Sequence, residues 1–369
     1  MAWPTVIIKI VNLMNGPIAD IECHFLFVVR GTVIGDVRNL IMVDSTSDLD
    51  EVLKDASSQG LAIVKAAQLN AKQSWTAGVM VIGADDSWQD AVKKANEVSS
   101  FEFVVLGFNA ENKQFLDDAI ALRQELKNAL SREVGVLCQL PAINNAAEGQ
   151  TWDQWLADTV AIPQNVASEY ISVVPNVHAE GDTLGKYAGR LANKEVSIAD
   201  SPARVQTGSV LGNTELMKDK DGRELDLALL KTLEQNRLSV PMWYPDYPGQ
   251  YWTTGNTLDV PGGDFQDIRH IRVAMKAARK VRVRAIARIA DRTLNSTPGS
   301  IAASKLYFTK DLRQMALTGV PGEIMPPEEG DIDIKWVSST EVEIYMSVQP
   351  YDCPVKITIA ISVKQGATS

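Results

Sequence analysis

Short apolar runs alternate with amphipathic stretches through the first half of the chain. The runs FEFVVLGF (101–108) and GVLCQL (135–140) are uncharged or nearly so, whereas FLDDAIALRQEL (115–126) repeats its apolar residues every three or four positions. Buried strands of a parallel sheet appear as continuous apolar runs, and helices connect them. The pattern predicts an α/β domain with a largely parallel sheet over residues 21–195.

The second half has a different pattern. A small-residue loop and a long Pro/Gly/aromatic loop precede two helical segments at 269–292 and 297–319, and three β-type runs follow at 332–339, 341–348 and 356–363. Pro298 near the start and Gly319 at the end of the second helix are the expected signals for its two ends. We expect a second, α+β domain over residues 196–353.

Both ends of the chain have the composition of β-strands. Residues 5–11 (TVIIKIV) precede the breakers Asn15, Gly16 and Pro17, and residues 356–363 alternate apolar and polar positions. We predict an N-terminal arm with its linker over 1–20 and a C-terminal arm over 354–369. The arms either join the chain's own sheet or are donated to a neighbouring subunit. The residues that would dock are Val6, Ile7, Ile8, Ile10, Ile357, Ile359, Ile361 and Val363.

Charge adds a feature that hydropathy does not show. Residues 269–292 hold nine Lys or Arg and one acid, in a chain whose net charge is −10. At about 100° per residue, five of these basic residues gather opposite an apolar stripe. They are Arg269, Arg272, Lys276, Arg279 and Lys280. A solvated face is one interpretation, but such faces usually mix signs.

An anionic partner is the alternative explanation of the basic face. Nucleic acid, membrane lipid and an acidic protein surface would each complement it. The acidic chain disfavours nucleic acid, and the helix lacks the bulky aromatic residues of a membrane-lying helix. We expect an acidic protein surface, on a neighbouring subunit or on another protein.

Motifs for catalysis or for cofactor binding are weak. Gly31, Gly35 and Gly83 do not form the dinucleotide fingerprint, and no P-loop or nucleophile elbow occurs. His24, His178 and His270 are too far apart for a zinc motif. Cys23, Cys138 and Cys353 read as small buried hydrophobes. We expect no enzyme activity, no cofactor, no metal and no membrane insertion, in a protein folded in the cytoplasm.

The order of features in residues 180–369 resembles contractile-tail sheath proteins of bacteriophages and R-type bacteriocins. GDTLGKYAGRLANKEVSIADSPARV is similar to the family's Gly-x-x-Ala-Gly-x-x-Ala helix and the Pro-Ala loop after it. Trp252, Gly255, Thr257 and Leu258 are similar to its Trp-Gly and Thr-Leu segment. The two helices, a PGE-containing linker and a strand-rich end follow in the family's order.

The resemblance implies a structural protein of the virion. Six-fold rings of subunits would stack helically around a tail tube, contract on a baseplate signal and drive the tube through the target envelope. It also implies assembly in the host cytoplasm, an outer α/β domain, an inner C-terminal domain, strand arms that bind neighbours, and contacts with tube, baseplate and tail terminator proteins. Under this resemblance the basic face would meet the tube or a neighbouring subunit. A soluble α/β enzyme and another tail or capsid component remain the alternatives.

Overall fold

The computed structural model describes residues 21–32 and 39–361. Its larger body is built on a six-stranded sheet with the order β2-β3-β1-β4-β5-β6. All neighbouring strands are parallel except β2, which is antiparallel to β3. The strands are β1 (His24–Arg30), β2 (Ile41–Asp44), β3 (Thr76–Ile82), β4 (Phe103–Asn109), β5 (Gly135–Leu140) and β6 (Ile171–Pro175). This confirms the predicted α/β class and the largely parallel sheet.

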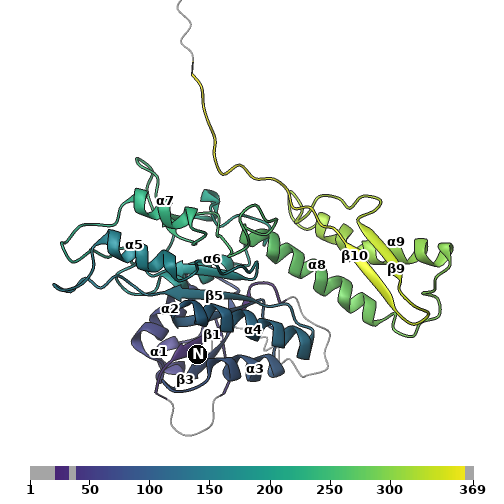
Figure 1. Cartoon of the computed structure of the whole chain (residues 1–369), viewed down its shortest axis with the longest axis horizontal. Helices are drawn as coiled ribbons and strands as arrows, with labels where there is room; N and C mark the ends of the chain where they lie inside the picture. Colours follow the sequence, from purple (N-terminus) through teal and green to yellow (C-terminus); the bar gives the residue numbers. More distant parts are fainter. Residues whose placement is uncertain (1–20, 33–38, 362–369) are drawn as a thin grey trace, which may run out of the picture.

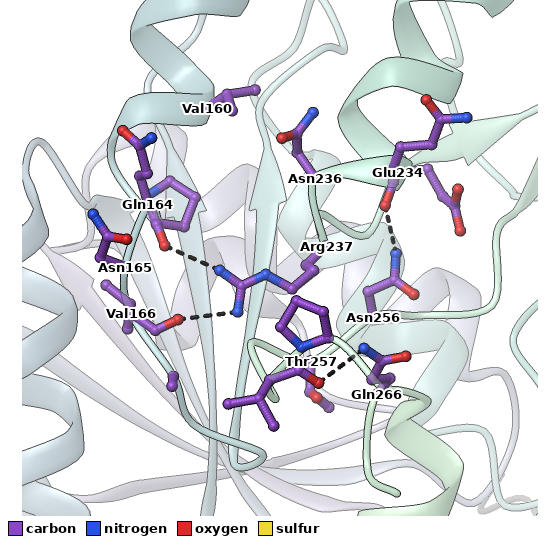
Figure 2. A pocket seen from close by; sticks show the side chains of 15 residues that line it. Val160, Gln164, Asn165, Val166, Glu234, Asn236, Arg237, Asn256, Thr257 and Gln266 are labelled. Carbon is purple, nitrogen blue, oxygen red and sulfur yellow. Dashed lines mark hydrogen bonds between the residues drawn. The ribbon is translucent and has the colours of Figure 1, made fainter. Parts of the chain in front are cut away.

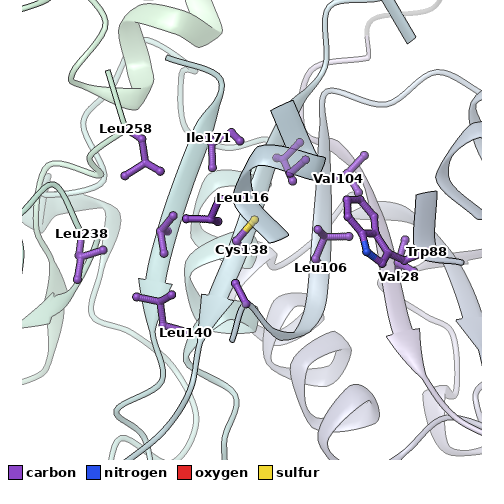
Figure 3. Packing of buried hydrophobic residues seen from close by; sticks show 14 of the residues in the cluster. Val28, Trp88, Val104, Leu106, Leu116, Cys138, Leu140, Ile171, Leu238 and Leu258 are labelled. Atoms are coloured by element: carbon purple, nitrogen blue, oxygen red, sulfur yellow. The ribbon is translucent and has the colours of Figure 1, made fainter. Parts of the chain in front are cut away.

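Helices cover both faces of this sheet (Figure 1). Successive side chains of a strand point to opposite faces, so Leu26 and Val28 of β1 join one core and Phe25 and Phe27 the other. Figure 3 shows the first core, where Trp88 and Leu116 pack on the strands. The helices on that face are α3 (Trp88–Val98), α4 (Lys113–Leu130), α5 (Trp152–Ala161) and α7 (Leu227–Gln235). On the other face lie α1 (Leu49–Val52), α2 (Ser58–Ala71) and α6 (Thr183–Leu191).

Helices α2 and α6 touch along their backbones. A Cβ added to Gly185 would lie 2.1 Å from the carbonyl oxygen of Ile63, and one added to Gly189 would lie 2.4 Å from that of Ala67. Neither distance is sterically possible, so glycine is required at both positions for this spacing of the helices. These glycines belong to the Gly-x-x-Ala-Gly-x-x-Ala stretch singled out in the sequence.

The predicted boundary at residue 195 falls inside the larger body. Leu230, Leu233, Val240 and Leu258 complete the first core, and the backbone amides of Ser239 and Leu258 bind β6 carbonyls at 2.9 and 2.8 Å. Residues 210–258 therefore cover the β6 side of the sheet. Apart from α7, loops dominate this segment, which also holds the short strands β7 (Pro241–Met242) and β8 (Tyr251–Trp252); a 3₁₀ turn at Val205–Thr207 precedes it. Its loop composition concealed its membership of the α/β body.

A smaller body follows, made of α8 (Ile268–Ile286), α9 (Pro298–Ala316) and the antiparallel pair β9 (Ile332–Trp336) and β10 (Val342–Met346). Its core contains Val281, Phe308, Leu312, Met315 and Ile332. Pro298 lies in the first turn of α9, where its missing N–H costs no helical hydrogen bond. Beyond β10 the chain returns to the start of α8, where the carbonyl oxygen of Tyr351 accepts from Arg269, and then runs away from both bodies (Figure 1).

Candidate functional site

Helix α8 is shared by the two bodies. Ile268, Ile271 and Met275 pack in the second core of the α/β body. Val273, Ala277 and Val281 pack in the core of the smaller body. The first half of α8 is therefore enclosed on several sides, which a single apolar stripe does not predict. Ile289, within the predicted helical segment 269–292, lies beyond the end of α8 and is 75% exposed.

Arg272 forms a buried ion pair with Glu102, just before β4. The side chains of Arg272 and Glu102 are 4% and 0% exposed. Arg272 Nε donates to Glu102 Oε1 at 2.7 Å, and its Nη2 donates to Oε2 at 2.9 Å. The backbone N–H of Cys23 donates to the same carboxylate at 2.6 Å. Burial lowers the pKa of Arg272, but the charge and hydrogen bonds of Glu102 raise it by a larger amount. The pKa of Arg272 therefore lies above its ordinary value.

Arg269 is held at the start of α8. Asp267, the N-cap, accepts from the backbone N–H of Arg269 at 3.0 Å and from its Nε at 2.7 Å. The Nη1 of Arg269 donates to the carbonyl oxygen of Tyr351 at 2.8 Å. Burial raises the pKa of the Asp267 carboxyl, although Arg269 opposes that shift. Arg269 therefore links the start of α8 to the beginning of the C-terminal segment.

Lys276 and Arg279 have acidic partners from two other parts of the chain. Lys276 Nζ donates to Glu323 Oε1 at 2.7 Å, in the loop after α9. Arg279 donates to Glu22, two residues before β1. Burial raises the pKa of Glu22, but the charge and hydrogen bond of Arg279 outweigh this effect. The pKa of Glu22 therefore lies below its usual value. Lys280 is half-buried and also interacts with its surroundings.

Four of the five residues of the predicted basic face are paired with acids of the same chain. Acids from distant segments neutralise Arg272, Lys276 and Arg279 inside the chain, and Asp267 neutralises Arg269. Glu22, Glu102 and Glu323 lie far from the helix in the sequence, so helical periodicity alone does not reveal them. A better signal was Glu102 in FEFVVLGF, because an acid within an apolar run needs a buried cation.

The end of α8 presents the more exposed surface. Arg282, Val283 and Ile286 are exposed. Arg284 pairs with Asp311 of α9 at 2.5 Å, and Arg288 pairs with Asp291 at 2.7 Å. This end of α8 is more exposed than the predicted five-residue face.

The C-terminal segment exposes a row of isoleucines. Ile357, Ile359 and Ile361 are 74%, 78% and 87% exposed. Residues 356–361 lie in no strand of the described chain, and β9 and β10 pair only with each other there. The other predicted arm residues, Val6, Ile7, Ile8, Ile10 and Val363, lie outside the described residues.

Arg237 and His178, two polar residues outside α8, are held by hydrogen bonds within the chain. A surface cavity of about 740 Å³ lies between the α5–β6 loop and the chain after α7 (Figure 2). Arg237 in it donates to the backbone carbonyls of Val166 at 3.0 Å and Leu258 at 2.8 Å, so it holds loops together. His178 is buried and bonds Gln250 at 2.6 Å, and burial lowers its pKa to about 3.

No group of three or more His, Cys, Asp or Glu residues is arranged to hold a metal within 21–32 and 39–361. Cys23 and Cys138 are buried as expected, whereas Cys353 is only partly so. Among the described residues, no helix is long and apolar enough to cross a membrane.

Family models and one curated relative cover nearly the whole chain. The DUF2586 N-terminal domain matches residues 3–256, and the DUF2586 C-terminal domain matches residues 264–366. A protein of Haemophilus phage HP1 (strain HP1c1), named "Putative tail sheath protein", is 42% identical over 373 residues, covering 97% of each chain. The chain belongs to this tail sheath family. The boundary between the two models, at 256–264, agrees with the packing of residues 210–258 on the larger body.

Solved structures of sheath proteins share the fold. The helical sheath of the anti-feeding prophage in its contracted state has a TM-score of 0.60 at 13% identity, covering 99% of this chain and all of that one. A sheath tail protein of Listeria innocua has a TM-score of 0.60 at 10% identity, covering 91% and 93%. One from Desulfitobacterium hafniense has a TM-score of 0.54 at 11% identity, covering 94% and 96%. At sequence identities this low, the similarity to these structures shows a shared fold alone.

Proposed function

We propose that this chain is the repeating structural subunit of a contractile tail sheath and that its terminal segments link neighbouring subunits. The exposed isoleucine row of the C-terminal segment carries the proposal, together with membership of the sheath family. In this proposal, subunits form six-fold rings that stack helically around a tail tube in the virion. The rings contract to drive the tube through the target envelope, after assembly in the host cytoplasm.

A neighbouring subunit offers the missing burial. Residues 356–361 alternate, so Ile357, Ile359 and Ile361 share one face of an extended strand. Burying each isoleucine contributes roughly 1.5–3 kcal/mol, or about 5–9 kcal/mol for three before the cost of ordering the segment. Main-chain hydrogen bonds to a strand edge add about 0.5–1.5 kcal/mol each.

The β9–β10 pair is the acceptor that fits such a strand. A two-stranded antiparallel pair has two outer edges, and each edge presents N–H and C=O groups that a further strand would satisfy. Val342, Ile344 and Met346 of β10 are only partly buried against the small core. An added strand would complete both the hydrogen bonding and the burial of this sheet.

The remaining partners follow from the same assembly. The sheath encloses a tube and meets a baseplate and a tail terminator, and the exposed end of α8 at Arg282, Val283 and Ile286 is a surface for the tube or an adjacent subunit. The α/β body would lie outward and the smaller body inward. Arg269, Arg272, Lys276 and Arg279 are paired within the chain and are assigned no such contact.

Removing the C-terminal segment tests the proposal. Deletion of residues 355–369 should leave a folded, soluble monomer that does not form hollow striated cylinders in negative-stain images. Circular dichroism and sedimentation separate this outcome from loss of the fold. Global unfolding would place the segment in the chain's own sheet, and retained cylinders would show that it does not link subunits.

A matched pair of substitutions sharpens the test. Ile359→Lys puts a charge on the face that docks, whereas Thr358→Lys puts the same charge on the other face. We expect Ile359→Lys to block polymerisation at low protein concentration and Thr358→Lys to be tolerated. Uniform small particles from the unmodified protein, with a ligand-dependent melting shift, would instead favour the soluble-enzyme alternative.

A further inference from the structure

Helix α8 binds the residues at which both terminal segments join the folded part of the chain. Arg279 binds Glu22, which immediately follows the N-terminal segment 1–20 and Ile21. Arg269 binds the carbonyl oxygen of Tyr351, from which the C-terminal segment continues. The two arginines are ten residues apart, which is about 15 Å along a helix. Two ends of the sequence, more than 300 residues apart, are thus attached to one short stretch of helix.

The start of the C-terminal segment, near residues 349–351, is attached to α8 through two sets of contacts. Arg269 is one route, and Asp267 fixes its guanidinium from the N-cap position. The second route runs from Lys276 to Glu323, and the neighbouring Met325 N–H donates to the carbonyl of Gln349 at 2.7 Å. Both routes end on α8, so the chain near residues 349–351 has a defined position before it leaves the body.

The chain that follows the N-terminal segment is attached to the folded bodies at two adjacent residues, Glu22 and Cys23. Glu22 binds Arg279, and the backbone N–H of Cys23 binds the carboxylate of Glu102, which Arg272 holds. Cys23 has a φ of 65°, in the left-handed region, so the chain turns sharply there before entering β1. The direction from which the chain reaches β1 is therefore set by contacts with α8.

These ion pairs are better suited to fixing geometry than to adding stability. A buried ion pair loses hydration on folding, and a well-packed apolar replacement is often as stable. An arginine, however, binds its acceptors with a defined direction through a planar group. Helix α8 already has apolar contacts in both bodies, so its burial does not depend on the arginines.

We propose that Arg269 and Arg279 are positioning residues that fix the directions in which the two terminal segments leave the subunit. Through them, a pull on either segment reaches α8 and, through Arg272 and Glu102, the sheet of the α/β body. This inference rests on the proposed linkage of subunits by the terminal segments. Its consequence is specific: loss of these contacts alters the geometry of the polymer rather than its existence.

The test compares the lattices of full-length variants by electron microscopy. Arg269→Met and Arg279→Met should polymerise with wild-type yield, but their helical rise and twist should shift or vary between particles. Arg279→Lys keeps the charge next to Glu22 but loses the planar guanidinium, so its lattice should shift less than that of Arg279→Met without returning to wild-type order. Arg288→Met is the matched control, because it removes an arginine of the same region whose partner, Asp291, is local. Wild-type rise and twist in both Met variants would overturn the proposal.

Two further samples keep the result unambiguous. If Arg279→Met does not fold, Glu22→Leu removes the acceptor of Arg279, and a normal lattice from it counts equally against the proposal. The deletion of 355–369 runs in parallel. Polymers from that deletion would refute linkage by the C-terminal segment, whereas a monomeric deletion with normal lattices from the Met variants would refute only the positioning role.

Discussion

Replacing Arg272 by methionine tests the central ion pair of the fold. The substitution leaves the fully buried carboxylate of Glu102 with the N–H of Cys23 but without its cation. Breaking a buried pair by removing one partner costs about 3–5 kcal/mol. At roughly 2.1 cal/mol/K per residue, unfolding of 369 residues has an entropy of roughly 0.8 kcal/mol/K. The melting temperature should therefore fall by about 4–6 °C.

A second variant separates the cost of an unpaired charge from the cost of lost packing. In Arg272→Met with Glu102→Gln, no charge is buried, and the amide oxygen of glutamine can still accept from Cys23. We expect this double variant to recover at least about 1 kcal/mol relative to Arg272→Met alone. Calorimetry of the monomer measures both. A loss below about 1 kcal/mol for Arg272→Met, or a double variant no more stable than the single one, would refute this reasoning.

Two further predictions concern the α/β body. His178 has a pKa of about 3 in the folded protein and about 6.5 in the unfolded chain, so the free energy of unfolding decreases as the pH falls below about 6.5. Between pH 7 and pH 5, the free energy of unfolding of the wild type should fall by about 2 kcal/mol more than that of His178→Gln. Equal losses in denaturant titrations at the two pH values would contradict this. Gly185→Ala should destabilise the protein by about 1–3 kcal/mol, because the new Cβ meets the carbonyl oxygen of Ile63. The control Gly299→Ala has open space around its Cβ and should be neutral or stabilising. Equal melting temperatures of the two variants would contradict the close contact of α2 and α6.

The elements of the sheet were predictable because each carries its own local signal. The strand runs at 24–30, 76–82, 103–109 and 135–140 are mostly apolar, with their polar residues at or near the ends, and the helices between them have a regular apolar period. The strands β9 and β10 and the ends of α9 were found for the same reason. The close approach of α2 and α6 was visible only as a glycine motif, because nothing in the sequence shows which helix Gly185 meets.

The boundary between the bodies was not predictable from composition. Outside α7, residues 210–258 look like a linker because they contain many Gly, Pro and small polar residues, yet they bury Leu238, Val240 and Leu258 in the first core. A loop segment has no period that reports which body it covers. Sequence composition therefore placed the division near residue 195, about 60 residues before the end of the first family model.

The charged face of α8 shows where helical periodicity fails as a guide to a site. A helical wheel assumes one buried face, but the first half of α8 contacts two cores and the segments between them. In such a position cations can be buried only when anions from other segments accompany them. Glu22, Glu102 and Glu323 supply those anions from three distant places in the sequence. The excess positive charge on α8 is therefore balanced by excess negative charge elsewhere in the same chain. It follows that the net charge of an isolated element says little about its partner until the acids of the whole chain have been placed.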